Sequence, residues 1–561
     1  MLQMVERQPG VEVNCVNGVR SHLVLCALAL VLQIPLAQSA QAALQISAKK
    51  TNNVSCTSGV CTPSAKDAVL NATDLANLLA SSNIKVESGT LAESIDITAA
   101  FNWASRHGLT LDSATGITVR AAVSVAGTGA VKIITNDGGA GGALAFLNGG
   151  SLAFLGLSNS LSINAMSYTL ENNPKQLASD IGQHPAGNFA FVGNYDASKD
   201  GAYSQAVVTA DFGGVFEGLG NTIENLTITS STNACIGMFS EVDGATLRDI
   251  ALTNLNITTS VQATVGGLAG CTSTGSAAIV GASSSGTVSV PPQSIVGGLI
   301  GAIQGSIDNS SSAASVTITG DSSSRADAGG LVGYIAGSIE SSYASGTVTG
   351  GANTCAGGLA GEASSIVASY ATGAVTGGDV SIDSGDTFGV GGLACLANVE
   401  QSYATGAVTG GSFQLVYGYA GIGGLVGVAS QITNSYATGN VTGGNYSDVG
   451  GLVGLTINPN ANVFEYSYST GAETGGTSAD VGGLVGLDAF PGDLFDTYWD
   501  ITTGVANANQ GAGFPLYDTG VSGLTSQMLM AKLPKGFSKS IWAQNKKINS
   551  GYPYLRAVPP S

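Results

Sequence analysis

Two stretches of the chain combine acidic and aromatic side chains in a way that suits ligand binding. They read DVSIDSGDTFG after Gly378 and SFQLVYGYAGI after Gly411, and both follow a glycine pair. Aromatic ring faces can stack on the apolar surfaces of a sugar or protein ligand, while carboxylates fix its hydroxyl groups. The alternative, that both stretches are variable loops packed on a scaffold, stays open. The candidate ligand-binding residues are Asp379, Asp383, Asp386, Phe413, Tyr417 and Tyr419.

Other residue types that could support chemistry do not form a catalytic pattern. Asp327, Asp448 and Asp480 each stand two positions before a glycine pair, but no other ligand type recurs with them. We therefore expect solvated turn residues there rather than a calcium site. The sequence has no HExxH motif, and no GxSxG motif in a strand–turn–helix context. We expect no catalytic residues, no metal and no cofactor.

A ten-residue segment recurs in the part of the chain that must position these stretches. SYATGAVTGG begins at Ser369 and again at Ser402, SYATGNVTGG begins at Ser435, and SYSTGAETGG begins at Ser467. A second motif, written VGGLVG from Val449, keeps step with it at intervals of 27 to 34 residues. Each unit holds three short β-favouring pieces separated by glycine, and none is long enough for a helix. Such units bury their apolar side chains only by stacking, so we predict an all-β fold, a parallel β-helix.

The repeat also predicts details of the coil. Glycine at the corners would permit the positive φ angles of sharp turns. The two long stretches leave the same corner of successive coils, so we expect them to lie side by side. A β-propeller is the main structural alternative, although its blades usually need repeats of about forty residues. One tyrosine per coil predicts an aromatic ladder of Tyr343, Tyr370, Tyr403, Tyr436 and Tyr468.

Composition shifts divide the chain into regions. LTSQMLMAKL, from Leu524, predicts a short amphipathic helix that covers the exposed strand edges of the last coil. YTLENNPKQLASDIG, from Tyr168, is polar and compatible with a helix, and it indicates a joint. The expected regions are a signal peptide at 1–42, an N-terminal segment with the CTSGVC loop at 43–82, irregular β-coils at 83–167, a joint with degenerate repeats at 168–260, the regular repeats at 261–504, and a capping segment at 505–561.

The first 42 residues have the features of a secretory signal. Arg20 precedes the apolar run LVLCALALVL, and the Ala-Gln-Ala that ends at Ala42 suits signal peptidase, so we expect cleavage between Ala42 and Ala43. No later stretch approaches 18 uninterrupted apolar residues, so we expect no integral membrane segment in the mature chain. An oxidising compartment favours a disulfide between Cys56 and Cys61.

Four further cysteines stand in the repeats, at Cys235, Cys271, Cys355 and Cys395. With one repeat per coil, Cys271 and Cys395 would lie four coils apart, roughly 19 Å at about 4.8 Å per coil. That separation is beyond disulfide reach. We expect all four to be small buried side chains rather than bridges or metal ligands.

Composition excludes two broad classes of protein. With 81 glycines and only 10% charged residues, the chain does not suit a helical bundle. Its net charge of −18 disfavours binding to nucleic-acid backbones.

The unit GGLVG…SYATG…VTGG resembles the GLUG-motif repeat of bacterial surface proteins of the filamentous-haemagglutinin type. FGGVFEGLGNTIENLTI from Phe212 and the ending from Tyr498 are similar to the same proteins. The resemblance implies a secreted or surface-exposed, adhesin-like β-helix of a Gram-negative bacterium. It also implies export by an outer-membrane transporter and attachment to a host-cell, glycan or matrix ligand. A carbohydrate-active β-helix enzyme and a structural spacer of the surface or biofilm matrix are the alternatives.

Overall fold

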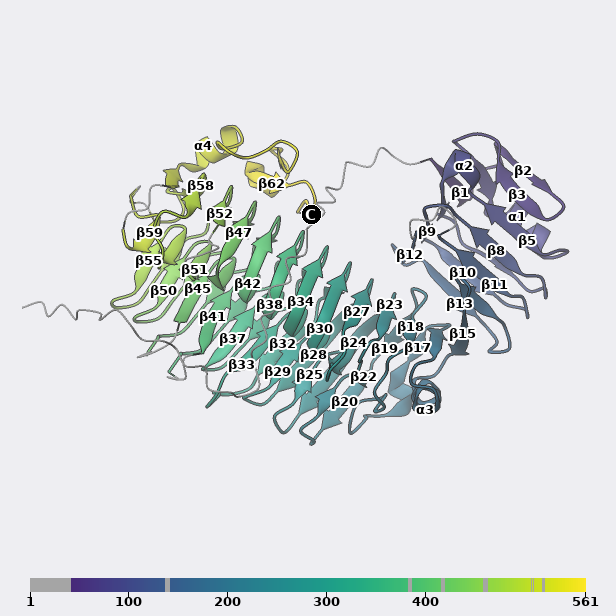
Figure 1. The fold of residues 1–561 in the computed structure, drawn as a ribbon, viewed down its shortest axis with the longest axis horizontal. Helices are drawn as coiled ribbons and strands as arrows, with labels where there is room; N and C mark the ends of the chain where they lie inside the picture. The colour runs from purple at the N-terminus through teal and green to yellow at the C-terminus, as the bar shows by residue number, and fades with distance from the viewer. Residues whose placement is uncertain are drawn as a thin grey trace, which may run out of the picture. The chain divides into compact units, whose positions relative to one another are not determined.

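The chain forms a stack of β-coils. The computed structural model describes residues 42–136, 142–381, 386–414, 419–457, 463–505, 507, 509–516 and 520–560. Within these residues, parallel strands stack into a β-solenoid of about 13 turns (Figure 1). The predicted parallel β-helix is confirmed.

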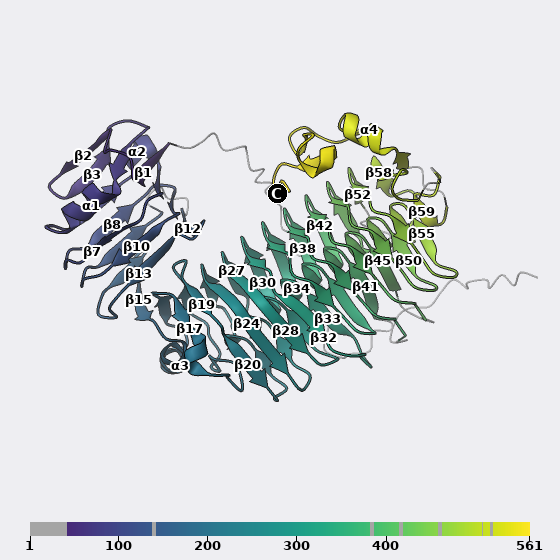
Figure 2. The same ribbon diagram turned by 180° about the vertical axis from the view of Figure 1, so that it is seen from behind.

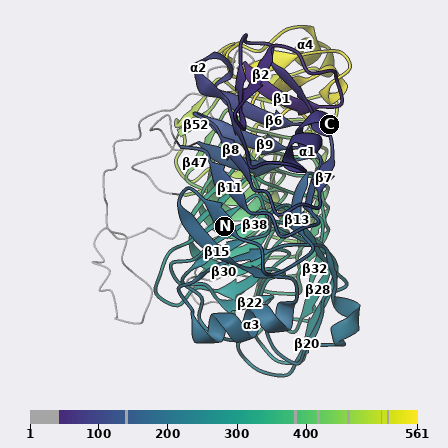
Figure 3. The same ribbon diagram turned by 90° about the vertical axis from the view of Figure 1, so that its right-hand side faces the viewer.

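Each regular coil contributes four strands to three parallel sheets. In one coil these strands are β33 (Ala326–Gly329), β34 (Val332–Glu340), β35 (Tyr343–Ala344) and β36 (Val348–Thr349). The first belongs to a 9-stranded sheet, and the last two belong to a 19-stranded sheet. The second pairs with strands of a third sheet. Figure 3, which looks along the stack, shows β28 and β32 of the 19-stranded sheet on the other side of the coil from β30 of the third sheet.

The strands of the three sheets follow one another along the stack, as Figure 2 shows from behind. The 9-stranded sheet consists of β21 (Cys235–Ile236), β25 (Thr264–Val265), β29 (Ile295–Gly297), β33, β37 (Thr354–Gly357), β41 (Thr387–Gly391), β45 (Tyr419–Gly423), β50 (Asp448–Gly450) and β55 (Asp480–Gly482). The 19-stranded sheet consists of β17 (Tyr195–Asp196), β19 (Thr222–Glu224), β20 (Thr227–Ser230), β24 (Ala251–Thr259), β28 (Ser283–Val290), β31 (Ser311–Ser312), β32 (Ser315–Ile318), β35, β36, β39 (Tyr370–Ala371), β40 (Val375–Thr376), β43 (Tyr403–Ala404), β44 (Val408–Thr409), β48 (Tyr436–Ala437), β49 (Val441–Thr442), β53 (Tyr468–Ser469), β54 (Glu473–Thr474), β58 (Thr497–Asp500) and β60 (Val521–Leu524). The third sheet includes β15 (Met166–Glu171), β16 (Asn188–Phe191), β18 (Val215–Glu217), β22 (Phe239–Glu241), β23 (Thr246–Arg248), β26 (Ala269–Cys271), β27 (Ala277–Val280), β30 (Ile300–Asp308), β34, β38 (Ala360–Val367), β42 (Ala394–Glu400), β46 (Val426–Ala429), β47 (Gln431–Thr433), β51 (Val453–Thr456), β52 (Val463–Glu465), β56 (Val485–Leu487), β57 (Leu494–Phe495) and β59 (Ala512–Phe514).

Close approach between coils, rather than a positive φ angle, explains the paired glycines. The pair Gly329 and Gly330 is absent from the positive-φ residues of the described chain. A Cβ atom on Gly330 would overlap the carbonyl oxygen of Gly358 in the next coil. The expectation of positive φ at these corners is therefore wrong, because the corners need space for the neighbouring backbone.

The recurring Ser-Tyr pair is a scaffold element. The tyrosine rings stack with centroids 4.9–5.1 Å apart from Tyr343 to Tyr468, so the predicted ladder is confirmed. The preceding serines are buried, and each hydroxyl accepts a backbone N–H from the neighbouring coil, as Ser402 Oγ does from Ser369 N at 3.0 Å. The same hydroxyl donates to a carbonyl two residues earlier, so the serines link the coils with each hydroxyl both donating and accepting.

The stack begins earlier than residue 83. β1 (Ala43–Ser47) pairs in parallel with β6 (Ser94–Ile97), so the segment expected to precede the coils belongs to them. Helices α1 (Ala72–Leu79) and α2 (Gly89–Ala92) lie between these strands in sequence. The other strands of this part are β2 (Val54–Thr57), β3 (Val60–Pro63), β4 (Val69–Asn71), β5 (Ile84–Glu87), β7 (Phe101–Trp103), β8 (Leu109–Asp112), β9 (Gly116–Val119), β10 (Ala122–Val125), β11 (Val131–Ile134), β12 (Ala143–Phe146), β13 (Ser151–Phe154) and β14 (Leu161–Ile163).

A break in the pattern follows β14. β14 and β15 pair in an antiparallel manner, whereas β15 and β16 are parallel again. Helix α3 (Pro174–Gln183) lies between β15 and β16, with Asn173 as its N-cap and Leu177 and Ile181 buried. This helix occupies the polar stretch in which the sequence indicates a joint.

The C-terminal segment covers the side of the solenoid rather than its end. β59 and β60 add to the last coil, and the chain then forms α4 (Ser526–Ala531), β61 (Trp542–Gln544) and β62 (Pro553–Leu555) (yellow in Figure 1). Trp542 packs 5.9 Å from the Tyr468 ring, and the Tyr468 hydroxyl donates to the Pro553 carbonyl at 2.6 Å. The short helix is as predicted, but its expected position over the last strand edges is wrong. The segment instead packs on the tyrosine column, where Leu529, Phe537 and Trp542 join the ladder rings in one buried cluster.

Disulfides join the six cysteines of the described chain in three pairs. Cys56 and Cys61 are cross-strand partners of the hairpin β2–β3, the pairing that their spacing favours. Cys235 bonds to Cys271, and Cys355 bonds to Cys395, with Cα atoms 5.6 and 5.4 Å apart. The expectation of unbridged cysteines is therefore wrong.

The last two disulfides join adjacent coils across one corner. Cys235 and Cys355 stand two residues before a coil's corner glycine, while Cys271 and Cys395 stand five and four residues after the first glycine of the next coil's pair. The sequence separations of 36 and 40 residues are thus one repeat plus the width of the corner. A search restricted to equivalent positions of the repeat misses both pairs.

None of the helices in the described part of the chain is long and apolar enough to cross a membrane.

Candidate functional site

The described ends of the two long stretches lie side by side on neighbouring coils, as predicted. Val380 and Phe413 form a parallel bridge, in which Val380 N donates to Ser412 O at 2.9 Å and Gln414 N donates to Val380 O at 2.8 Å. Farther along, Thr387 of β41 is the register partner of Tyr419 of β45. The corner of the solenoid therefore presents both stretches together. We call the exposed surface around Asp386, Tyr419 and Tyr446 the loop edge.

The predicted site residues divide between surface, core and undescribed positions. Asp379 and Asp386 are exposed, and Asp386 stands directly before β41. Tyr419 is 54% exposed and begins β45. Asp383 and Tyr417 lie outside the described residues.

Phe413 belongs to the core and not to the loop edge. Its side chain is only 6% exposed and packs in the main hydrophobic cluster of the solenoid. Its bridge partner Val380 is 1% exposed, so both side chains continue the inward-facing column of the coils. The prediction of an exposed aromatic at this position is wrong, because the strand-like pairing turns the side chain inward.

Asp379 has a structural partner of its own. Its Oδ1 accepts the backbone N–H of Ser412 at 2.7 Å. The residues at this turn position in the next two coils bond in the same way. Ser412 Oγ accepts from Asn445 N at 3.1 Å, and Asn445 Oδ1 accepts from Thr477 N at 2.8 Å. This relay ties successive turns together beneath the loop edge and gives it a fixed base.

Tyr446 is an exposed aromatic that sequence reasoning missed. Gly423 and Gly450 are register partners, and Tyr419 and Tyr446 each stand four residues before them. The residues that pair are Ile422 with Val449 and Gly423 with Gly450, so the two tyrosines lie on adjacent coils, each shortly before this pairing. Tyr446 is 63% exposed and has a φ angle of 58°. Counting positions from the glycine pair, instead of looking only for long insertions, would have identified it.

Acidic groups lie close to the loop edge in sequence and in the stack. Asp448 and Asp480 are register partners on β50 and β55, as the shared column predicts. Burial raises the pKa of Asp448 to about 7, and the charge of Asp480 adds to the effect. Burial also raises the pKa of Asp480. These are half-buried strand residues, so the expectation of solvated turns is wrong.

Asp327 occupies the same column and has a cationic partner. Its side chain is 4% exposed, and its Oδ1 accepts from Arg325 Nε at 2.8 Å. The guanidinium of Arg325 also donates to Glu362 on the neighbouring strand β38. The burial of this carboxylate is thus compensated by a two-sided ion pair.

Comparison with known proteins identifies the repeat. The GLUG motif matches residues 324–349 and 418–442, and the second match contains Tyr419. The chain is therefore a β-solenoid that carries GLUG repeats.

No curated protein gives a significant match to the chain. Among solved structures, a candidate immunoglobulin A1 protease from Bacteroides ovatus is similar, with 17% identity over 66% of this chain and 85% of that one. The TM-score is 0.29, and a likeness of this size carries no conclusion about activity.

Proposed function

We propose that this GLUG-repeat solenoid is an adhesin-like protein that attaches to a glycan through the loop edge, without catalysing a reaction on it. The exposure of Tyr419 and Tyr446 on adjacent coils, each four residues before a register-paired glycine, carries the proposal. Large aromatic side chains bury extensive apolar area on folding, so two neighbouring tyrosines left more than half exposed point to a ligand.

The loop edge has the features of a carbohydrate-binding surface. Two exposed tyrosine rings on adjacent coils offer apolar faces to the sugar rings of a glycan, and the phenol groups can hydrogen-bond to ring hydroxyls. Asp386, which precedes the register partner of Tyr419, adds an exposed carboxylate. The polar relay through Asp379, Ser412 and Asn445 holds the turns in place, so little conformational entropy is lost on binding.

A surface location fits the same role. We propose export directed by the N-terminal signal, passage through an outer-membrane transporter, and display on or release from a Gram-negative cell. Residues 1–41 of this signal, which is expected at 1–42, lie outside the described residues. The disulfides between neighbouring coils suit the oxidising compartment that an exported protein enters.

The test compares exposed tyrosines of the loop edge with an exposed tyrosine of the ladder. The full-length protein and a Tyr419→Ala/Tyr446→Ala variant are applied to an array of immobilised oligosaccharides, and retained protein is quantified. Tyr343→Ala is the matched control, because Tyr343 is 40% exposed but belongs to the ladder on the 19-stranded sheet. We expect the double variant to lose at least about tenfold in retention, equivalent to about 1.4 kcal/mol, and the control to bind like the wild type.

Equal retention of the double variant and the wild type would overturn the assignment of the loop edge. If no oligosaccharide on the array retains the wild-type protein, glycan attachment is overturned and a structural spacer is favoured. Release of reducing or unsaturated sugar ends from a bound polysaccharide would replace the adhesin with a carbohydrate-active enzyme.

A further inference from the structure

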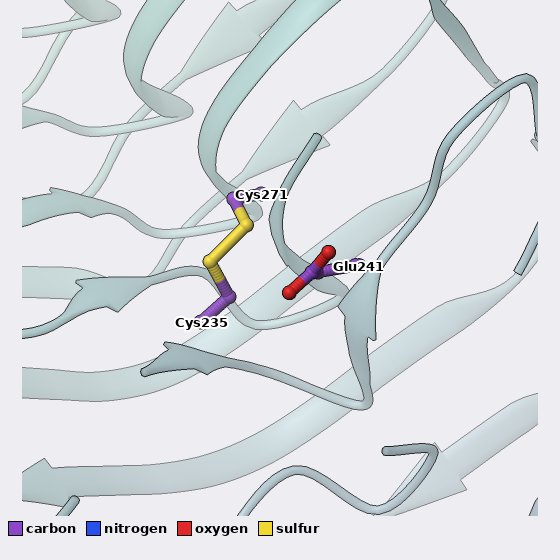
Figure 4. Close-up of side chains that lie close together, drawn as sticks. All are labelled: Cys235, Glu241 and Cys271. Carbon is purple, nitrogen blue, oxygen red and sulfur yellow. A yellow bond between two sulfur atoms is a disulfide. The ribbon is translucent and has the colours of Figure 1, made fainter. Parts of the chain in front are cut away.

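A carboxylate lies beside the disulfide that joins the first regular coils. Cys235 of β21, Glu241 of β22 and Cys271 of β26 each direct one potential ligand atom to a common point, and these atoms lie within 4.8 Å of one another (Figure 4). Glu241 and Cys271 are register partners in adjacent coils, and Cys235 belongs to the same coil as Glu241. Parallel pairing therefore fixes all three backbones.

The second inter-coil disulfide has the same elements in a different electrostatic setting. Cys355 bonds to Cys395, and Glu362 stands on the coil of Cys355 as Glu241 stands on the coil of Cys235. Here the Arg325 guanidinium donates to Glu362, and its Nη2 lies 3.4 Å from Cys355 Sγ. A cation already occupies the space between the carboxylate and the sulfur. No ion pair within the described part of the chain involves the Glu241 carboxylate.

Reduction would convert the first corner into a set of metal ligands. A dithiol reductant supplies two electrons and two protons, so the Cys235–Cys271 bond breaks, two thiols form, and the reductant becomes a disulfide. Thiolate sulfur and carboxylate oxygen are both zinc ligands, and zinc binding then releases one proton from each thiol to solvent. Tetrahedral bonds of about 2.3 Å place two sulfurs about 3.8 Å apart. The Cα separation of 5.6 Å allows this distance through side-chain rotation alone.

We propose that Cys235, Cys271 and Glu241 form a redox-gated site for zinc or a similar thiophilic divalent cation. The reduced protein binds the ion with three protein ligands and a water molecule. A small-molecule disulfide then accepts two electrons from the thiolates and leaves as two thiols after taking two protons from solvent, so the Cys235–Cys271 bond forms again and the ion is released. The Cys355–Cys395 corner is excluded from this role by Arg325. The site is independent of glycan attachment, because it lies on other coils than the loop edge.

The experiment compares the two corners within the full-length chain. The chain has eight cysteines. One variant keeps Cys235 and Cys271, a second keeps Cys355 and Cys395, and in each variant the other six cysteines are replaced by serine. Both are reduced with a phosphine, transferred to anaerobic buffer, and titrated with Zn²⁺ against a chromophoric chelator. Cd²⁺ replaces Zn²⁺ in a parallel titration that records sulfur-to-metal charge transfer. Circular dichroism before and after reduction reports whether the solenoid stays folded.

We expect one tight Zn²⁺ per chain in the first variant and none in the second. Adding Glu241→Gln to the first variant should weaken binding by at least about tenfold, and reoxidation should release the ion. Equal uptake by both cysteine variants would overturn the proposal, since it would reflect thiols alone. Uptake unchanged by Glu241→Gln would overturn the ligand assignment even if reduction loosens the fold.

Discussion

Two columns of side chains run along the same coils and behave in opposite ways. In the Ser-Tyr column the residue types repeat, the serines are buried, and the rings stack at 4.9–5.1 Å. In the column two residues before the corner glycine of each coil, residue types change from coil to coil and include Cys235, Asp327, Cys355 and Asp448. We call the latter the corner column. Repetition thus marks backbone requirements shared by every coil, and variation marks the positions at which individual coils acquire their own chemistry.

The largest expected effect tests the repeated column. Tyr436 is fully buried between its ladder neighbours and packs 6.1 Å from Trp542. Tyr436→Ala should lower the free energy of unfolding by about 3–5 kcal/mol, because it removes a buried ring and leaves a cavity. Guanidinium titration followed by tryptophan fluorescence measures the effect, and Trp542 reports the local coils.

Two matched variants sharpen this prediction. Within the described residues the Tyr436 hydroxyl has no hydrogen-bond partner, so Tyr436→Phe should be neutral or stabilising. Tyr446→Ala removes an exposed ring and should stay within about 0.5 kcal/mol of the wild type. Equal effects of the two alanine variants would erase the distinction between ladder and loop edge.

The second prediction concerns the corner column as a source of stability. Cys355–Cys395 closes a separation of 40 residues, and its loss should lower stability by about 2–4 kcal/mol. Cys395→Gly is the suitable variant, since the corresponding residues of the neighbouring coils are Gly361 and Gly427. Urea titrations with and without a reductant measure the difference.

The glycine pattern provides the control for this variant. A Cβ atom built on Gly427 would lie 2.8 Å from Val390 N, so the position tolerates a side chain only when it bonds to the preceding coil. Under reducing conditions the wild type should therefore lose its advantage, and Cys395→Gly should be at least as stable. A difference that persists in reductant would show that the cysteine stabilises the corner by packing instead.

The third prediction concerns how the Asp448 carboxyl of the corner column makes stability depend on pH. The pKa of Asp448 is 3.8 in the unfolded chain and about 7 in the folded one, because burial disfavours the charged form. The unfolded state loses its proton first, so this carboxyl lowers stability progressively as pH rises from about 4 to about 7. Asp448→Asn should therefore be more stable than the wild type at pH 8 by roughly 1 kcal/mol. The half-buried position keeps this figure well below the value for complete burial.

Denaturation midpoints of wild type and Asp448→Asn at pH 4 and pH 8 check the sign. The two proteins should differ at pH 8 and agree at pH 4. Asp480→Asn is the comparison variant. It should also be more stable than the wild type at pH 8, since burial raises the pKa of Asp480 as well. A stabilisation by Asp448→Asn that is equal at both pH values would contradict the assignment to charge.

The sequence predicts the repeated column well and the variable column poorly. The spacing of SYATG and VTGG suffices for the stacked coils and the tyrosine ladder, because each coil imposes the same steric conditions. The Cys235–Cys271 and Cys355–Cys395 pairs depend on which residues meet across a corner between two coils, and repeat positions alone do not show this. The burial of Phe413 escaped prediction for a similar reason, since one backbone bridge to Val380 decides which way the ring points.

The smallest expected effect asks whether a turn acid belongs to the scaffold or to the ligand site. Asp379 Oδ1 accepts from Ser412 N at 2.7 Å, and Asp321 Oδ1 accepts from Ala352 N at 2.9 Å in an earlier coil. Both bonds are exposed, so Asp379→Ala and Asp321→Ala should each cost about 0.5 kcal/mol of stability. Neither should alter retention on the oligosaccharide array. If Asp379→Ala alone reduces retention, the carboxylate contacts the ligand as well as the neighbouring turn, and the loop edge extends from Tyr446 to Asp379.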